Sequence, residues 1–209
     1  NCPVIEAYGM TEATHQMTSN PLPPKKQKAG FVGIPAGPEV AIMDDNYKIM
    51  KNGEVGEICI KGNNVTSGYE NNPEANRTSF SRGWFRTGDQ GFFDKDGYLK
   101  ISGRLKEIIN KGGEKISPLE VDNVLMDHPS IEQAVCFGYE DKMLGEDIAT
   151  AIILKEGLNL NEADFRIYAK EKLAKFKIPK KIFFVTEIPK GATGKLQRNV
   201  LAKKFGLNN

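Results

Sequence analysis

The sequence lacks long hydrophobic runs, and no apolar stretch approaches the roughly 18 residues that a membrane-spanning helix needs. The amino end also lacks the basic segment followed by an apolar one that is typical of a signal peptide. Both absences predict a soluble protein with no membrane span.

Cysteine is scarce, and its three copies, Cys2, Cys59 and Cys136, lie far apart with no CxxC pair. An odd number of distant cysteines implies neither a disulfide framework nor a zinc site, so a reducing compartment is expected. Excess charge of one sign is also lacking, because 29 Lys and Arg residues face 27 Asp and Glu residues. A formal net charge of +2 gives no electrostatic signature for the whole chain.

A change of composition around Gly103-Arg104-Leu105-Lys106 divides the 209 residues, a length that suits one large domain or two small ones. Residues 30–102 contain short β-like runs separated by Asp, Asn and Gly turns, which indicates mostly antiparallel β structure. After Arg104 the pattern becomes α+β. We therefore predict an α+β protein with domains 1–105 and 106–209, divided at Leu105/Lys106.

Local patterns predict individual elements. The region 8–12 is expected to be a tight polar loop, and the Pro- and Lys-rich loop 21–28 is expected to be exposed. A hairpin with a Gly112-Gly113 turn should join 105–109 to 115–116. Strands are predicted over 4–7, 40–43, 55–60, 98–101, 134–139, 148–154 and 181–185, and helices after Pro73, from Pro118 to His128, over 161–175 and over 198–205.

The pentapeptide Tyr8-Gly9-Met10-Thr11-Glu12 combines groups that can serve a nucleotide. An aromatic ring can lie on a base, a hydroxyl can contact a phosphate, and a carboxylate can bind Mg²⁺, while a glycine allows close backbone approach. A strand-to-loop turn with a local hydrogen bond explains the same residues without a ligand.

Asp89, Arg104 and the Gly112-Gly113 turn form a second set of polar and glycine positions. A carboxylate such as Asp89, after Thr-Gly at a strand end, can accept hydrogen bonds from a ribose diol. Arg104 can make a planar two-pronged contact, and Gly112 with Gly113 leaves unobstructed backbone beside which a narrow ligand can pass. Turn formation and a solvated basic surface explain each position singly.

Lys195 lies in the glycine-containing run Pro189-Lys190-Gly191-Ala192-Thr193-Gly194-Lys195. A lysine on such a loop can move into a site and neutralise charge that develops on a phosphate or carboxylate oxygen. The alternative is a solvated lysine loop before a helix.

Four motifs follow one another along the chain: YGMTE (8–12), GWFRTGD (83–89), GRLKEIINKGGEKISPLEVD (103–122) and PKGATGKLQR (189–198). In this order they resemble the signature motifs of the adenylate-forming superfamily, which includes acyl-CoA synthetases, luciferases and peptide-synthetase adenylation domains. Within the superfamily, the GGEKISP form is similar to the acyl-CoA ligase branch. The run MTEATHQMTSNPLP (10–23) resembles the oxalate-CoA ligases of the peroxisomal-CoA-synthetase type.

The resemblance implies an acid-CoA ligase that uses ATP, Mg²⁺ and CoA on a small carboxylic acid, with oxalate favoured. A carboxylate attacks the α-phosphate of ATP to give acyl-AMP and pyrophosphate, and the thiol of CoA then displaces AMP. By motif position, the resemblance implies adenine stacking by Tyr8 beside Gly9, α-phosphate contact by Thr11, Mg²⁺ binding by Glu12, ribose binding by Asp89 and Arg104, and charge neutralisation during adenylation by Lys195.

The resemblance also implies a division of labour between the domains. Residues 1–105 would be the end of the AMP-binding amino-terminal domain, and 106–209 a mobile carboxyl-terminal domain that pivots at Lys106. That pivot would move Lys195 away from the site and bring the Gly112-Gly113 hairpin to the passage for CoA.

His15 is the predicted specificity residue. A small dianionic acid needs a second anion-binding group, and a histidine supplies a donor that can become cationic near neutral pH. The alternative is a histidine satisfied by neutral partners on a loop. His128, which lies before Pro129 on an apolar helical face, is expected to be structural.

Two departures from the family qualify these expectations. The Ser/Thr/Gly-rich phosphate loop and the acyl pocket that the family carries upstream of YGMTE are absent, and no initiator Met precedes Asn1. We therefore expect the carboxyl-terminal part of a longer or processed enzyme, which needs its missing amino-terminal part to adenylate an acid. The end Gly-Leu-Asn-Asn is not a Ser-Lys-Leu-type signal, so both cytoplasmic and peroxisomal locations are compatible with the sequence.

Rival interpretations retain other functions. A 4-coumarate, medium-chain or luciferase-like ligase would use the same motifs on another acid. Residues 166–204 are rich in Lys and Arg and contain only Glu171 and Glu187 as acidic residues, which is compatible with a non-catalytic fragment that binds RNA or another polyanion. No nucleic-acid module or aromatic platform accompanies that charge, so nucleic acid is the less favoured partner.

Overall fold

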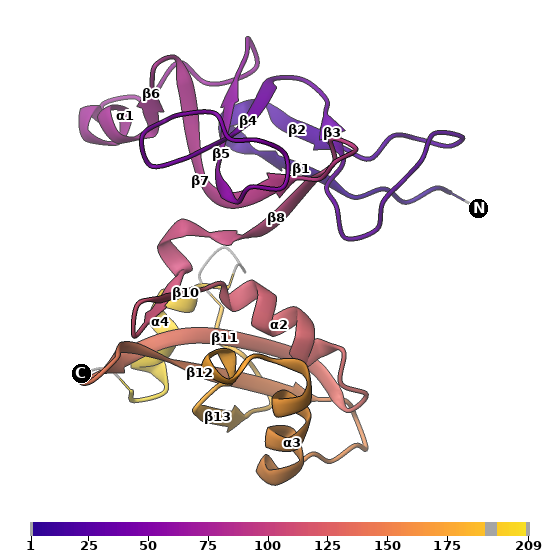
Figure 1. Ribbon diagram of the computed structural model, residues 1–209, viewed down its shortest axis with the longest axis vertical. Coiled ribbons are helices and arrows are strands. Elements are labelled where there is room, and N and C mark those ends of the chain that lie inside the picture. Colours follow the sequence, from indigo (N-terminus) through magenta and orange to yellow (C-terminus); the bar gives the residue numbers. More distant parts are fainter. Residues whose placement is uncertain (1, 191–195, 208–209) are drawn as a thin grey trace. The chain divides into compact units, whose positions relative to one another are not determined.

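The computed structural model describes residues 2–190 and 196–207, and Figure 1 shows their elements. The chain divides into two compact units, Asn1–Leu105 (unit 1) and Lys106–Asn209 (unit 2). Each contains helices and sheets whose strands pair mainly in antiparallel fashion, which confirms the predicted α+β class.

Unit 1 is built from two sheets and one short helix. In the larger sheet, strand β5 (Gly56–Lys61) buries three consecutive side chains, Ile58, Cys59 and Ile60, because both of its faces are covered. The smaller sheet has the order β1 (Ala7–Met10), β2 (His15–Ser19), β3 (Ile34–Pro35), with a 3₁₀ turn η1 (Thr11–Ala13) between the first two strands. The larger sheet has the order β4 (Glu39–Met43), β5 (Gly56–Lys61), β7 (Trp84–Phe93), β6 (Phe80–Ser81), with β8 (Leu99–Arg104) paired to β7; the helix is α1 (Pro73–Ser79).

The start of unit 1 corrects two predictions. The strand predicted over 4–7 instead runs from Ala7 to Met10, so the region 8–12 is not a loop. The prediction failed because the partner strand β2 is polar, and only Met17 and Thr18 are buried along it. Without apolar alternation, sequence pattern alone does not distinguish such a strand from a polar loop.

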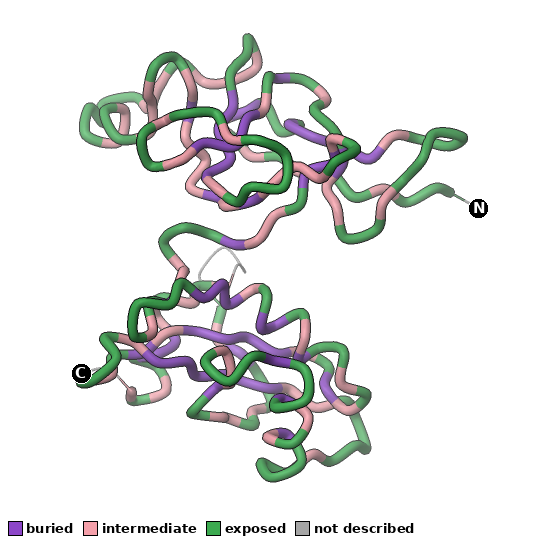
Figure 2. The backbone as a smooth tube through the Cα atoms, viewed as in Figure 1, coloured by how far each residue is buried: buried purple, intermediate pink, exposed green. Residues whose placement is uncertain are grey.

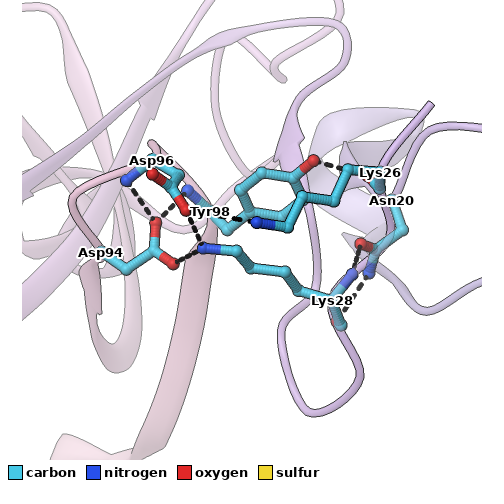
Figure 3. A network of polar contacts seen from close by, with 6 residues as sticks. All are labelled: Asn20, Lys26, Lys28, Asp94, Asp96 and Tyr98. Atoms are coloured by element: carbon cyan, nitrogen blue, oxygen red, sulfur yellow. Dashed lines mark hydrogen bonds and ion pairs between the residues drawn. The ribbon is translucent and has the colours of Figure 1, made fainter.

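The Pro- and Lys-rich loop 21–28 is anchored at its carboxyl end (Figure 3). Lys28 donates hydrogen bonds to both Asp94 and Asp96 in the turn between β7 and β8, with 2.5 Å between its Nζ and Asp96 Oδ2. Its ammonium also lies 4.8 Å from the centroid of the Tyr98 ring. Lys28 is therefore only partly exposed, with 17% of its side chain accessible, whereas residues 22–27 are exposed as predicted.

The described residues of unit 2 contain a five-stranded sheet with apolar clusters on both faces. Along β11, Ala134 and Cys136 belong to one cluster, and Val135 and Phe137 to the other, as the two-residue period of a strand requires. Figure 2 shows the resulting buried runs along β11 and β12. The strands are β9 (Ile109–Lys111), β10 (Glu114–Ile116), β11 (Ile131–Asp141), β12 (Gly145–Leu154) and β13 (Lys181–Phe184), in the order β10-β9-β12-β11 with β13 parallel to β12.

Helices cover this sheet, and two of them begin where their capping residues predict. Ser117 accepts a hydrogen bond from Glu120 N at the start of α2, and Asn161 accepts one from Asp164 N at the start of α3. The first cluster, which contains Ala134 and Cys136, also contains side chains of α2 and α3. The second cluster, which contains Val135 and Phe137, also contains side chains of α4. The helices are α2 (Pro118–Met126), α3 (Glu162–Lys172) and α4 (Arg198–Lys204), with 3₁₀ turns η2 (Leu105–Glu107) and η3 (Lys175–Lys177).

The predicted hairpin is shorter than expected. β9 and β10 pair Ile109 with Ile116 around the Gly112-Gly113 turn, but Leu105–Glu107 forms the 3₁₀ turn η2 rather than a strand. Ile109 and Ile116 are both buried in the first cluster, whereas Leu105 and Lys106 are exposed. The strand begins at the point where side chains start to enter the core.

A buried ion-pair cluster joins α4 to other parts of unit 2. The Arg198 guanidinium lies 2.6 Å from Asp122 Oδ2 in α2 and 3.1 Å from Glu107 Oε2 in η2. Its Nη1 also donates a hydrogen bond of 2.8 Å to the Cys136 carbonyl oxygen in β11. Only 3% of the Asp122 side chain is exposed, so Arg198 neutralises a carboxylate that lacks water.

Candidate functional site

Three residues that the sequence predicted for a nucleotide come together in unit 1. Asp89 in β7 lies opposite Arg104 in β8 in the strand register, and the distance from Arg104 Nε to Asp89 Oδ1 is 3.1 Å. Tyr8 in β1 donates a hydrogen bond of 2.5 Å to the other oxygen, Asp89 Oδ2. The Asp89 carboxylate therefore has a cation on one oxygen and a hydroxyl on the other.

Burial governs the chemistry of this cluster. The Asp89 side chain is 11% exposed, whereas that of Arg104 is 54% exposed. Burial raises the pKa of the Tyr8 hydroxyl well above its usual value, and the Asp89 charge and hydrogen bond raise it further. Tyr8 is consequently a neutral donor at physiological pH.

The position of Asp89 corrects the expectation that it lies at a strand end. It lies inside β7, directly before a shift of register between Gln90 and Gly91. Thr87 stabilises this irregular stretch, because its hydroxyl donates to Ile58 O at 2.7 Å and accepts from Asp89 N at 3.1 Å. Against β5, the other neighbour of β7, the register also shifts between the pairs Glu57–Gln90 and Cys59–Arg86, and Asp89 lies within this second irregularity.

Thr11 and Glu12 follow directly after β1, in the 3₁₀ turn η1. Thr11 is exposed and Glu12 is half-buried. Oε1 of Glu12 accepts a hydrogen bond of 2.9 Å from the Tyr69 hydroxyl, whose pKa is raised to about 12 by burial and then by this bond and the Glu12 charge. Tyr69 therefore stays protonated at neutral pH and remains a donor to the carboxylate.

His15 begins β2 with a backbone conformation that non-glycine residues rarely adopt. Its φ is 82°, and that of the preceding Thr14 is 51°. The side chain is exposed. Consecutive left-handed residues are costly, and such strain is concentrated at functional positions.

Gly9 has a packing role that requires no ligand. A Cβ atom built on it would lie 1.6 Å from the carbonyl oxygen of His15, because β2 passes directly beside it at the register shift in β1. The close approach predicted for a ligand at this glycine is therefore already made by the neighbouring strand.

In unit 2, the Gly112-Gly113 turn and Lys106 are exposed. Both glycines have positive φ, 59° and 93°, which is the conformation that favours glycine in a tight hairpin. A Cβ on Gly113 would meet no atom, whereas one on Gly112 would lie 3.3 Å from Leu144 Cδ2. Lys195 lies outside the described residues, and Lys190 and Leu196 on either side of it form a single antiparallel bridge.

The donor set is compatible with a magnesium ion held mainly by a nucleotide. Among the described residues no group of three or more His, Cys, Asp or Glu side chains could hold a metal. Mg²⁺ commonly takes one or two protein carboxylates together with substrate phosphates and water, so Glu12 alone fits that pattern.

Within the described part of the chain, no helix is long and apolar enough to cross a membrane.

Sequence reasoning missed Asn64 and Tyr69, which contact the turn that carries Glu12 and His15. Both lie in an irregular segment between β5 and α1, where no periodicity marks a functional residue. A Gly-Tyr pair at 68–69 was the available signal, but its link to Glu12 spans 57 positions.

Comparison with known proteins gives two family matches. Residues 1–70 match the AMP-binding enzyme family, and residues 120–195 match the AMP-binding enzyme C-terminal domain. The oxalate–CoA ligase of Saccharomyces cerevisiae is 53% identical over 207 residues, which are 98% of this chain and 38% of the relative. The oxalate–CoA ligase of Arabidopsis thaliana is also 53% identical, over 97% of this chain and 40% of its own length.

Among solved structures, ATP-bound MatB from Rhodopseudomonas palustris superposes with a TM-score of 0.90 and 34% sequence identity. The match covers 97% of this chain and 40% of the MatB chain. The chain thus spans about two fifths of the length of the relatives that it matches.

Proposed function

The chain belongs to the AMP-binding enzyme family, and from this membership we propose that it is the carboxyl-terminal part of an ATP-dependent acid–CoA ligase acting on oxalate. In the first half-reaction a carboxylate oxygen attacks the α-phosphorus of ATP, and pyrophosphate leaves. In the second half-reaction, the thiol of CoA loses its proton, its sulfur attacks the acyl carbonyl carbon, and AMP leaves.

The observation that carries the proposal is the Tyr8–Asp89–Arg104 cluster. Its members come from three strands, and their contacts leave a carboxylate whose two oxygens have lone pairs to spare. Ribose hydroxyls would donate to those lone pairs, with Arg104 as a second contact, while the Tyr8 ring would lie against adenine. Gly9 would keep β1 and β2 close enough to hold this ring in place.

Thr11 and Glu12 would serve the phosphates. The exposed Thr11 hydroxyl would donate to an α-phosphate oxygen, and Glu12 would hold Mg²⁺ through its carboxylate. Bound Mg²⁺ supplies charge neutralisation at the phosphates, which is the main requirement of phosphoryl-type chemistry. The Tyr69 hydroxyl occupies Oε1 of Glu12, which leaves Oε2 for the cation.

His15 would bind the second carboxylate of the acid. Oxalate is small and carries two carboxylates. When one carboxylate reacts with ATP, the other lies close to the side chains around the reacting centre. The exposed imidazole of His15 would donate a hydrogen bond to that group. Replacement of His15 by Ala should then raise the KM for oxalate.

Unit 2 would complete the two half-reactions in turn. Lys195 would neutralise charge during adenylation, and the Gly112-Gly113 turn would lie beside CoA during thioester formation. Lys106, which is exposed in η2, would be the pivot between the two orientations.

The polyanion-binding alternative is not favoured. Several basic side chains between 166 and 204 are engaged by acidic partners inside unit 2, which reduces the charge available to a nucleic acid. The pairs are Arg166 with Glu162, Lys177 with Glu120, Lys180 with Asp141, and Arg198 with Glu107 and Asp122.

The test of the function uses the full-length enzyme that contains this chain. It is mixed with ATP, Mg²⁺, CoA and, in parallel, oxalate, 4-coumarate or a medium-chain fatty acid. We expect pyrophosphate release and, by mass spectrometry, oxalyl-CoA, with the highest kcat/KM for oxalate. Preference for another acid would overturn the substrate, and absence of acyl-CoA from every acid would overturn the reaction.

A further inference from the structure

Three residues of the irregular segment Asn64–Tyr69, between β5 and α1, make hydrogen bonds with the stretch from Glu12 to Gln16. Its backbone N–H at Thr66 donates a hydrogen bond of 2.7 Å to the Glu12 carbonyl oxygen. The side chains of Asn64 and Tyr69, at the two ends of the segment, bind backbone carbonyls of Ala13 and Gln16 and the Glu12 carboxylate, respectively. A segment without its own ladder thus supplies hydrogen bonds to another segment.

Asn64 holds the strained part of the turn. Its Nδ2 donates to the carbonyl oxygens of Ala13 at 2.8 Å and Gln16 at 3.3 Å, which bracket Thr14 and His15. The Thr14 hydroxyl donates in return to the Asn64 carbonyl oxygen at 2.7 Å. Residues with positive φ persist when surrounding contacts over-determine them, and these three bonds are such contacts.

Tyr69 holds the carboxylate of Glu12. Its own backbone is fixed by Asn76 of α1, which accepts a hydrogen bond from Tyr69 N at 2.7 Å and donates one to Tyr69 O at 2.9 Å. The ring packs against Phe85 with 6.5 Å between the ring centroids. The hydroxyl that reaches Glu12 is therefore attached to a fixed ring on a fixed backbone.

We propose that the segment Asn64–Tyr69 is a brace that positions the acid-binding and magnesium-binding side chains. Asn64 fixes the backbone that aims His15, and Tyr69 selects the orientation in which Oε2 of Glu12 faces the cation. Both are positioning residues, and neither touches substrate. The assignment of acid and cation to these two side chains rests on the proposed function, whereas the brace itself rests on the contacts.

The first test compares Asn64→Ala with Asn63→Ala in the full-length enzyme. Asn63 is the exposed neighbour of the same residue type, so it is a matched control. We expect Asn64→Ala to raise the KM for oxalate about tenfold, which corresponds to the loss of one or two hydrogen bonds, with an unchanged KM for ATP. Asn64→Gln, which keeps the donor group, should recover part of the loss.

A readout that needs no turnover is hydrogen exchange in the peptide over residues 11–19. Without substrate, Asn64→Ala should accelerate exchange there and Asn63→Ala should not. Unchanged exchange overturns the brace. Faster exchange with unchanged KM for every accepted acid overturns its positioning role. If the wild-type enzyme activates no acid, the proposed function fails, and exchange alone then decides whether the brace exists.

The second test compares Tyr69→Phe with Tyr168→Phe, which removes a hydroxyl that donates to Val124 O in unit 2. Tyr69→Phe keeps the packed ring and should raise severalfold the Mg²⁺ concentration needed for half-maximal pyrophosphate release. It should also weaken binding of Mn²⁺ in the presence of a non-hydrolysable ATP analogue, followed by electron paramagnetic resonance. Unchanged Mn²⁺ affinity in Tyr69→Phe would overturn this half of the proposal.

Discussion

The hydroxyl of Tyr8 and the carboxylate of Asp89 are joined by a hydrogen bond of 2.5 Å, although the residues lie 81 positions apart in the chain. The bond connects the two sheets of unit 1, since Tyr8 is in β1 and Asp89 is in β7. The bond also couples the aromatic residue to the carboxylate that we propose binds ribose, so a change at either residue should affect the other.

Two substitutions of Tyr8 distinguish its hydrogen bond to Asp89 from its proposed stacking on adenine. Tyr8→Phe removes the bond to Asp89 and keeps the ring, so the KM for ATP should rise by about 10- to 100-fold, which is the usual net worth of one hydrogen bond to a charged group. Tyr8→Ala also removes the ring and should raise it further. Steady-state kinetics of the full-length enzyme measures both, and equal effects would argue against a stacking role.

Replacement of Gly9 by Ala should destabilise unit 1 by about 3 kcal/mol or more, because the new Cβ would overlap the His15 carbonyl oxygen and force two strands apart. Gly30→Ala is the matched control: its φ is 77° but its Cβ would meet no atom, so only backbone strain of about 1 kcal/mol is expected. Thermal unfolding compares the two. Equal losses would mean that β2 can move away from β1.

Arg198→Met tests the buried ion-pair cluster in unit 2. The substitution leaves the Asp122 carboxylate buried without its cation and should cost about 3–5 kcal/mol of unfolding free energy. Lys203→Met, on an exposed position of the same helix, should change it by less than about 0.5 kcal/mol. Denaturant unfolding of both variants measures the difference, and a loss at Arg198 no larger than at Lys203 would contradict the interpretation.

Asp141 should titrate at unusually low pH. Its pKa is lowered to about 2, first by the hydrogen bond from Lys180 and then by the backbone N–H groups of Met143 and Leu144. Because the folded-state pKa lies below the unfolded one, this carboxylate stabilises the fold above about pH 4, and the contribution is lost as the pH falls toward 2.

Lys180→Met should therefore raise the pKa of Asp141, with the exposed neighbour Lys142→Met as control. The carboxyl carbon of Asp141, followed by NMR during acid titration, reports it directly. An Asp141 midpoint that stays unchanged in Lys180→Met would show that the backbone donors alone set the value.

The proposed pivot at Lys106 should tolerate alanine but not proline. Lys106→Pro fixes φ and should impair the overall reaction more than the half-reaction that uses one orientation, whereas Lys106→Ala leaves the backbone free and should have little effect. Pyrophosphate exchange and single-turnover thioester formation in the full-length enzyme measure the two half-reactions. If proline lowered both equally, the pivot would lie elsewhere.

Elements that bury regular apolar faces could be predicted from the sequence. Ile58 and Ile60 mark a central strand, and Pro118 after the capping Ser117 marks the start of a helix. The polar strand β2 could not, because Met17 is its single buried apolar side chain. Its pairing depends on Gly9, whose missing Cβ admits the neighbouring strand.

The candidate site likewise contains residues that the sequence could predict and residues that it could not. Tyr8, Asp89 and Arg104 could be selected because each lies in a motif whose order along the chain is distinctive. Asn64 and Tyr69 could not, because their function depends on contacts with residues about 50 positions earlier in the chain, which no local pattern records.

The sheet of unit 2 carries one apolar cluster on each face, and the two clusters share only the backbone of the strands between them. Phe165 packs in the first and Phe137 in the second. Side chains in separate clusters have no common partner, so the energetic costs of truncating them should add. Apolar substitutions in one cluster should therefore leave the packing of the other unchanged, provided that the Arg198–Asp122 ion pair between α4 and α2 is kept.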